Sequence, residues 1–236
     1  MTPLVLLPGM MCDARLFGPQ IGALSGRYAL HLPPLTGADT LAALAAQILQ
    51  NAPPRFALAG LSMGGIVAME VLRLAPDRVT KIALLDTNPL AETPQQQARR
   101  LPQIARVLAG GLDTVMRDEM KPLYLHDTPQ RAEILDLCTT MALDLGPDVF
   151  AAQSRALASR PDQSATLAAF KGPALVLMGE HDILCPRARH DLMHALMPHS
   201  RLAIIAGAGH LPTLEKPDET TAELRRWLED EWTPPC

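Results

Sequence analysis

The chain has 236 residues, of which 48% are hydrophobic and 19% are charged, and its formal net charge is −4 at pH 7. This length fits one domain, and the composition is globular rather than collagen-like or disordered. This net charge argues against a nucleic-acid-binding protein, because such a protein needs an excess of basic residues to neutralise phosphates. No apolar run approaches the roughly 20 residues of a membrane-spanning helix, and no signal peptide is visible. We therefore expect a cytoplasmic protein with no nucleic-acid partner and no membrane partner, and its oligomeric state stays open.

The four cysteines are far apart in the chain. Cys12, Cys138, Cys185 and Cys236 form no C-x-x-C pair and are too sparse for a disulfide scaffold. We expect them to be reduced thiols.

Six short runs of bulky apolar residues predict strands. Continuous apolarity over four to six residues is typical of strands that are covered on both faces. The runs are 4–7, 28–32, 56–59, 81–85, 174–178 and 202–206.

Helical spacing of apolar residues separates most of these runs. It occurs in 41–49, 66–74 and 192–196, and a further helix is expected over 217–232, which starts with proline and has acidic residues in its first turn. Strands alternating with helices predict an α/β fold, with a mostly parallel sheet of about six strands and helices on both faces.

One long interval contains no convincing strand. Segment 87–172 has only helical patterns interrupted by prolines, and it is far longer than an ordinary crossover between parallel strands. The segment is either a lid over the carboxyl edge of the sheet or a packing appendage. Without a repeat or a low-complexity linker, the chain reads as one domain over 1–236.

A nucleophile motif follows the third run. Gly60-Leu61-Ser62-Met63-Gly64 has the pattern G-x-S-x-G between a strand and a helix, which is typical of a nucleophile elbow. The sharp turn pushes the Ser62 hydroxyl out of the sheet edge, and side chains at 60 and 64 would collide with neighbouring backbone. No Gly-Lys-Ser/Thr follows, so the motif is not a phosphate loop.

A serine nucleophile needs a base and an acid, in the chain order serine, acid, histidine. His210 follows the last predicted strand, and Asp182 follows the strand before it. We expect Ser62, Asp182 and His210 to be the catalytic residues. Asp86, at the end of the fourth strand, is the competing acid, and the sequence leaves open whether it substitutes for Asp182.

Two backbone N–H groups are expected to form the oxyanion hole. One belongs to Met63, directly after the nucleophile, and the other to Met10, in the loop after the first strand. The expected substrate pocket is lined by Met10, Met63, Tyr124, Phe150 and Leu211, with other apolar side chains of segment 87–172 above it.

Two further features are expected to have no role in the chemistry. His190 and His194 have the spacing of a helical zinc site but lack the glutamate and a third ligand, so we expect no metal and no organic cofactor. The pair Arg99-Arg100 is expected to lie on a solvated helix face rather than to bind a carrier protein.

With these motifs, nearly the whole chain resembles the α/β-hydrolase fold superfamily, and it is similar to small carboxylesterases, pimeloyl-ester esterases and lactone hydrolases. The resemblance implies that segment 87–172 is a lid, and that the usual antiparallel strand pair at the N-terminus is missing.

The expected function is that of a serine hydrolase. It would cleave carboxylic esters of small to medium acyl or alkyl groups through an acyl-enzyme, with a small-molecule ester as its substrate. The same residues also serve lactonases, thioesterases, and cofactor-free haloperoxidases or carbon–carbon hydrolases, so these remain alternatives, as does a binding module on the same fold.

Overall fold

Six strands form one sheet in the order β2-β1-β3-β4-β5-β6, and every neighbouring pair is parallel. The strands are β1 (Leu4–Leu7), β2 (Leu30–His31), β3 (Phe56–Leu61), β4 (Val79–Leu85), β5 (Ala174–Gly179) and β6 (Arg201–Ile205). The computed structural model describes residues 2–230 of the chain. It confirms the predicted α/β class and the six-stranded sheet.

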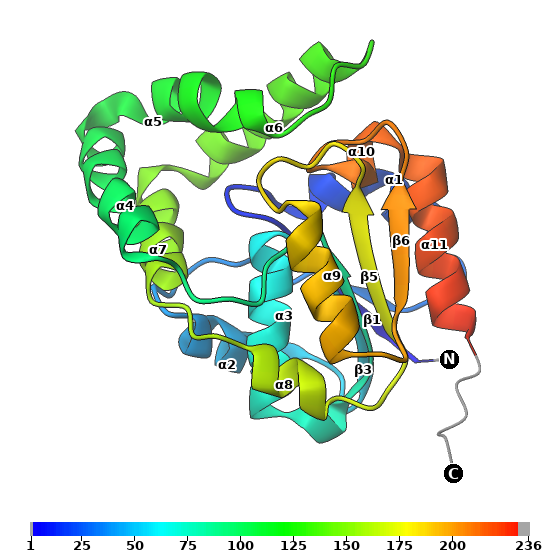
Figure 1. The fold of residues 1–236 in the computed structure, drawn as a ribbon. Coiled ribbons are helices and arrows are strands. Elements are labelled where there is room, and N and C mark those ends of the chain that lie inside the picture. Colours follow the sequence, from blue (N-terminus) through cyan, green and yellow to red (C-terminus); the bar gives the residue numbers. More distant parts are fainter. Residues whose placement is uncertain (1, 231–236) are drawn as a thin grey trace.

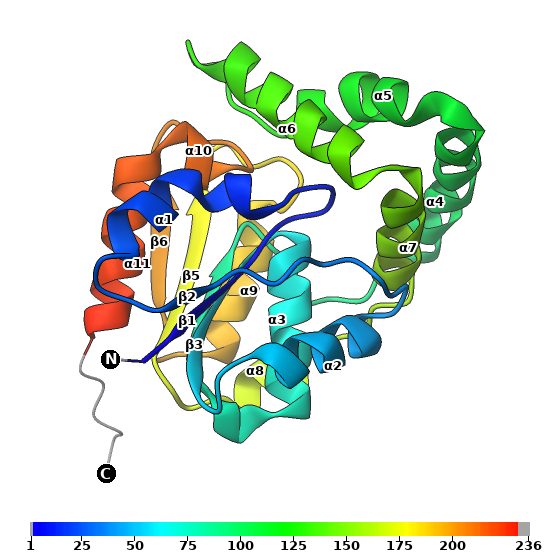
Figure 2. The ribbon, with the colours of Figure 1, turned by 180° about the vertical axis from the view of Figure 1, so that it is seen from behind.

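Helices cover both faces of this sheet (Figures 1 and 2). The helices α1 (Gly18–Leu24) and α11 (Pro217–Glu229) lie on one face, and α2 (Leu41–Asn51), α3 (Met63–Leu74), α8 (Ser164–Ala169) and α9 (Arg187–Leu196) lie on the other. Within β1, Leu4 and Leu6 pack in the core between the sheet and the helices α1 and α11. Val5 and Leu7 pack in the core on the opposite face, with α2 and α3. Both cores need apolar residues, which is why the strands read as continuous apolar runs.

Two of the differences from the predicted bounds concern the edge strand and the last helix. The edge strand β2 has two residues rather than the five of 28–32, because the N–H of Tyr28 is bonded to the Leu24 carbonyl in the turn after α1. The last helix, predicted over 217–232, ends at Glu229 within the described residues, and Trp232 lies outside them, as does Cys236. Cys12, Cys138 and Cys185, the cysteines of the described part, form no disulfide.

Most of segment 87–172 forms a separate helical layer beyond the carboxyl ends of the strands (Figure 1). It contains α4 (Pro94–Arg106), α5 (Leu112–Thr114), α6 (Arg131–Leu145) and α7 (Pro147–Ala158). The helix α8, which we had included in it, instead packs against α3 and α9 on the sheet face. The layer therefore ends near residue 158, and α8 completes an ordinary crossover to β5. None of the helices described in residues 2–230 is long and apolar enough to cross a bilayer.

Candidate active site

Ser62 occupies the sharp turn between β3 and α3. Its φ of 55° and ψ of −116° place it in a region that residues with side chains rarely adopt. Two hydrogen bonds hold this turn: the Ser62 N–H donates to the Leu85 carbonyl at 2.9 Å, and the Thr87 hydroxyl donates to the Ser62 carbonyl at 2.7 Å. The strained conformation is thus fixed from the neighbouring strand β4.

The glycines of the motif are required by close backbone contacts, as predicted. A Cβ on Gly60 would lie 2.2 Å from the Gly64 carbonyl oxygen, and one on Gly64 would lie 2.0 Å from the Leu7 carbonyl oxygen. No side chain fits at either position without moving the backbone of β1 or of the turn.

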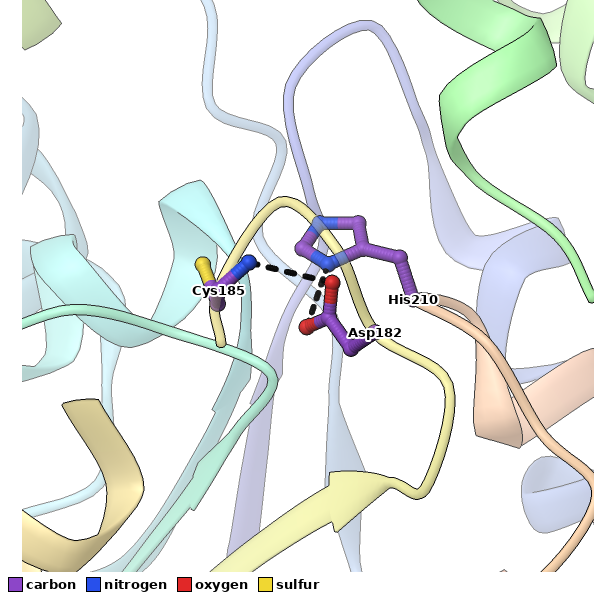
Figure 3. A group of neighbouring side chains, drawn as sticks. All are labelled: Asp182, Cys185 and His210. Carbon is purple, nitrogen blue, oxygen red and sulfur yellow. Dashed lines mark hydrogen bonds and ion pairs between the residues drawn. The ribbon is translucent and has the colours of Figure 1, made fainter. Parts of the chain in front are cut away.

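A chain of two hydrogen bonds joins Ser62, His210 and Asp182. His210 Nε2 lies 2.9 Å from Ser62 Oγ, and His210 Nδ1 lies 2.9 Å from Asp182 Oδ2. The second oxygen of Asp182, Oδ1, accepts the Leu184 N–H at 2.8 Å and the Cys185 N–H at 3.0 Å. Figure 3 shows the bonds of Asp182 to Cys185 and His210. The structure brings together the three residues that the sequence singled out.

The environment of Asp182 favours its ionised form. Burial by itself raises the pKa of this carboxyl group, but the charge and hydrogen bond of His210 and the Cys185 N–H outweigh it, and the pKa lies below its ordinary value. A carboxylate at this place fixes the His210 tautomer that carries hydrogen on Nδ1 and accepts at Nε2.

The loop of His210 is held by a buried carboxylate, Glu215. One oxygen, Oε1, accepts the N–H groups of Gly209 at 2.9 Å and Leu211 at 3.1 Å, on either side of His210. The other, Oε2, accepts the N–H of His126, in the helical layer, at 2.9 Å. The His210 N–H itself donates to the Tyr124 carbonyl at 2.7 Å. These bonds tie the histidine loop to residues 124–126 of the layer.

The loop after β1 lies beside the nucleophile. A Cβ on Gly9 would lie 3.6 Å from the Cβ of Ser62. The N–H of Met11, whose φ is 54°, donates to Oε1 of Gln153 on α7 at 2.9 Å, and Gln153 Nε2 donates to the Leu35 carbonyl at 2.8 Å. Gln153, buried in the layer, thus fixes the backbone next to Met10.

A cavity of about 310 Å³ opens above Ser62 and His210. Part of its wall is apolar, with Met10, Met63, Ile66, Met120, Leu123, Tyr124 and Leu157. Polar side chains of α4 and its neighbours also line it: Glu92, Gln96, Arg99, Arg100, Gln103, Glu119 and Arg160. Arg100 and Arg160 both pair with the buried carboxylate of Glu92.

This lining corrects three expectations. Phe150 is fully buried among other apolar side chains of the core, and Leu211 packs in the core shared with α1 and α11, so neither lines the cavity. The wall provided by the layer is largely polar, whereas we expected an apolar ceiling. Arg99 and Arg100 both belong to this wall; Arg99 is exposed, as expected for a solvated face, whereas Arg100 is half-buried and paired with Glu92.

Asp86 does not approach His210 as a rival acid. It is fully buried behind Asp182, and its Oδ1 accepts the Gly179 N–H at 2.8 Å. Potential metal donors within residues 2–230 gather in two groups, Asp182 with Cys185 and His210, and Asp182 with Asp86 and His190. Both use Asp182, whose oxygens already accept three hydrogen bonds, and His194 is in neither group.

A family profile, described as the alpha/beta hydrolase family, matches residues 4–224. The chain belongs to the alpha/beta hydrolase family. The match covers every strand of the sheet together with Ser62, Asp182 and His210.

Several relatives and solved structures that resemble the chain are esterases. A pimeloyl-[acyl-carrier protein] methyl ester esterase of Xanthomonas oryzae is 28% identical over 95% of this chain and 94% of its own, and one of Aliivibrio salmonicida is 26% identical over 98% and 93%. A thermophilic esterase of Thermogutta terrifontis, solved with malate bound, is 28% identical with a TM-score of 0.88 over 97% of this chain and 89% of its own. These similarities agree with the predicted enzyme class, a hydrolase acting on ester bonds.

Two residues that shape the site were missed from the sequence. Glu215 stands five residues after His210 and just before Lys216-Pro217, and a glutamate so close to the expected base was a usable signal. Gln153 gave none, because its partners Met11 and Leu35 are more than 100 residues away in the chain.

Proposed function

We propose that the protein hydrolyses carboxylic esters of small to medium acyl or alkyl groups, with Ser62 as nucleophile, His210 as base and Asp182 as the acid that orients it. The observation that carries this proposal is the pair of 2.9 Å contacts linking Ser62 Oγ, His210 and Asp182 at the floor of the cavity. A serine hydroxyl is a poor nucleophile until a base takes its proton, and His210 Nε2 lies at the distance this transfer needs.

In the first half-reaction Ser62 Oγ attacks the ester carbonyl carbon while its proton passes to His210 Nε2. The N–H groups of Met10 and Met63 bind the oxyanion, and the positive end of α3 adds to this stabilisation. Asp182 stabilises the imidazolium. His210 then gives the proton to the departing alcohol, which leaves an acyl group on Ser62.

In the second half-reaction water enters. His210 takes one proton from the water, whose oxygen attacks the acyl carbon, and returns that proton to Ser62 Oγ as the carboxylic acid departs. The enzyme is regenerated without an external cofactor.

The cavity supports a short or medium substrate. Its volume of about 310 Å³ is at the lower end of small-molecule pockets, and the apolar side chains of Met63 and Ile66, which follow Ser62 in the chain, line it. The group next to the scissile bond is therefore apolar, and the polar wall along α4 suits an uncharged polar or anionic group elsewhere on the substrate.

A second candidate comes from the relatives' name, which describes methyl esters of a pimeloyl group on an acyl-carrier protein. The specific observation in its favour is the polar wall, with Arg99, Arg100 and Arg160 against Glu92 and Glu119. A methyl group fits beside Ser62, and the rest of a carrier-bound acyl chain would pass along this wall toward solvent.

The deciding experiment is intact-mass analysis after incubation with a fluorophosphonate, with the Ser62→Ala variant as control. A single adduct that the variant lacks is expected, because only an activated serine reacts. A panel of simple esters, methyl monoesters of dicarboxylic acids, lactones and thioesters, together with peroxide plus acetate and a diketone, then assigns the bond type. Folded protein that takes no adduct and turns over no ester would refute the proposal.

A further inference from the structure

Asp86 is a buried titratable group that the proposed mechanism does not use. It follows β4 with a φ of 44°, in the left-handed region, and its side chain is 0% exposed. Its Oδ1 accepts one hydrogen bond, from the Gly179 N–H. Its Oδ2 is shielded from solvent and accepts no hydrogen bond from an N–H or hydroxyl group in the part of the chain that is described.

Two titratable side chains that lie close to Asp86 are the imidazole of His190 and the carboxyl group of Asp182. A carboxyl oxygen of Asp86 and one of Asp182 lie within 4.8 Å of each other, and both groups are buried. Carboxyl oxygens are only acceptors when both groups are ionised, so a hydrogen bond between them requires one proton.

The proton is assigned to Asp86 because Asp182 accepts more hydrogen bonds from the protein than Asp86 does. Asp182 accepts hydrogen bonds from Leu184, Cys185 and His210, all of which stabilise a negative charge. Asp86 has only the Gly179 N–H. Burial, and then the negative charge of Asp182, raise the pKa of Asp86 well above its ordinary value.

We propose that Asp86 is a positioning residue that stays neutral at the working pH and donates its carboxyl proton to Asp182. The hydrogen bond holds the Asp182 carboxylate against His210 without adding a second negative charge to the site. Its effect on turnover rests on the proposed function, whereas the position of the proton does not.

The other titratable groups around Asp86 do not change the charge of the pair, which is one negative charge for Asp86 and Asp182 together. His190 on α9 is neutral, since burial lowers its pKa to about 4. Burial and the two aspartates raise the pKa of the Cys185 thiol, which keeps it protonated. Glu215, a more distant carboxyl group, further disfavours a charge on Asp86. Asp86 and Asp182 together therefore carry one negative charge, and it faces His210.

Two variants of Asp86 compare a neutral side chain that keeps the donor with the loss of the whole side chain. Asp86→Asn keeps an acceptor for the Gly179 N–H and a donor for Asp182, and asparagine tolerates a positive φ. Asp86→Gly removes both groups without backbone strain. We expect kcat/KM of Asp86→Asn to stay within about threefold of wild type, and that of Asp86→Gly to fall about tenfold or more, as for the loss of one hydrogen bond to a charged group.

The pH dependence gives the contrast that a structural role would not. With a neutral Asp86, the acid limb of kcat/KM against pH does not move in Asp86→Asn. If Asp86 were ionised in the wild type, the asparagine would remove a negative charge near His210, and the limb would shift to lower pH by about one unit or more. Such a shift would overturn the proposal.

Infrared spectroscopy tests the proton without any turnover. The spectrum of wild type minus that of Asp86→Asn, recorded at neutral pH, is expected to show the carbonyl stretch of a protonated carboxyl group. A carboxylate band in its place would overturn the proposal even in a protein with no esterase activity. An infrared signal of the protonated acid in a protein that hydrolyses no ester would instead refute the proposed function alone.

Discussion

Replacement of Glu215 tests how the histidine loop is held. Three N–H groups donate to this carboxylate: those of Gly209 and Leu211 through Oε1, and that of His126 through Oε2. In Glu215→Ala all three lose their acceptor. In Glu215→Gln the amide oxygen can keep the two bonds beside His210, while the amide nitrogen faces the His126 N–H and cannot accept it.

The magnitudes follow from the count of lost acceptors. Each buried donor without a partner costs about 1–3 kcal/mol, and water entering the truncated site lowers the cost for alanine, so we expect about 3 kcal/mol for Glu215→Ala and about 1–2 kcal/mol for Glu215→Gln. For a chain of this size, that corresponds to a fall in Tm of about 6–12 °C and about 2–8 °C. A displaced imidazole reduces kcat/KM by about 100-fold in the alanine variant.

The measurement is thermal unfolding together with ester turnover and the rate of fluorophosphonate labelling at Ser62. Glu180→Ala is the matched control, because Glu180 is exposed, accepts the Gly207 N–H at 3.1 Å and otherwise lies only near the exposed ring of His181, at 3.5 Å, among the described residues. This control should change stability by less than about 0.5 kcal/mol and leave turnover unchanged.

Two results would refute the reasoning. In one, Glu215→Ala keeps both its Tm and its kcat/KM close to those of the wild type. In the other, Glu215→Gln loses as much turnover as the alanine variant, which would mean that the two bonds beside His210 do not position it.

The other predictions concern the site and its support. Ser62→Ala should lower kcat by about 10⁴-fold or more with the fold intact, by circular dichroism. Asp182→Asn should cost about 10⁴-fold and Asp86→Asn only a few-fold; equal losses or the reverse order would contradict the assignment of the acid. The pKa of Asp86 is raised in the folded protein, so its contribution to the free energy of unfolding depends on pH. The contribution is fully present below about pH 4 and decreases by up to about 1.4 kcal/mol per pH unit as the pH rises. Urea unfolding should therefore show Asp86→Asn gaining stability relative to wild type between acidic and neutral pH. Gly64→Ala should unfold the elbow, since its Cβ meets a backbone oxygen at 2.0 Å, whereas Gly22→Ala, with nothing within 4 Å in α1, should be neutral or stabilising by Tm.

Much of the fold was predictable because strands buried on both faces have a distinctive pattern. All six runs of apolar residues overlap an observed strand, and the predicted bounds differ most at β2. Being at the edge of the sheet, β2 has a partner on one side only, so its length depends on the turn after α1 rather than on apolarity. The apolar run 28–32 therefore predicts that a strand is present but does not give its bounds.

The nucleophile, base and acid were accessible because each follows a recognisable strand. Parallel strands end at one edge of a sheet, so residues directly after β3, β5 and β6 are brought together whatever their separation in the chain. The cavity wall was not accessible in this way. It depends on how α4 lies against the sheet, and the spacing of apolar residues within one helix does not say which of its neighbours it faces.

Asp86 shows a further limit of sequence reasoning. Its position after β4 marked it as an acid near the site, but its protonation depends on which groups reach it in space. Only the structure shows that Asp182 has three donors and Asp86 one.

The attachment of the helical layer has a consequence for engineering. Gln153 bonds to the loop beside Met10, while Tyr124 and His126 bond to the histidine loop, so both halves of the reacting centre depend on residues of the layer. Exchanging the whole layer for that of another hydrolase, a common route to new selectivity, would remove these contacts along with the cavity wall. A chimera that replaces only residues 94–120 would change the polar cavity wall on α4. It would keep Gln153, Tyr124 and His126, which hold the loops beside Met10 and His210.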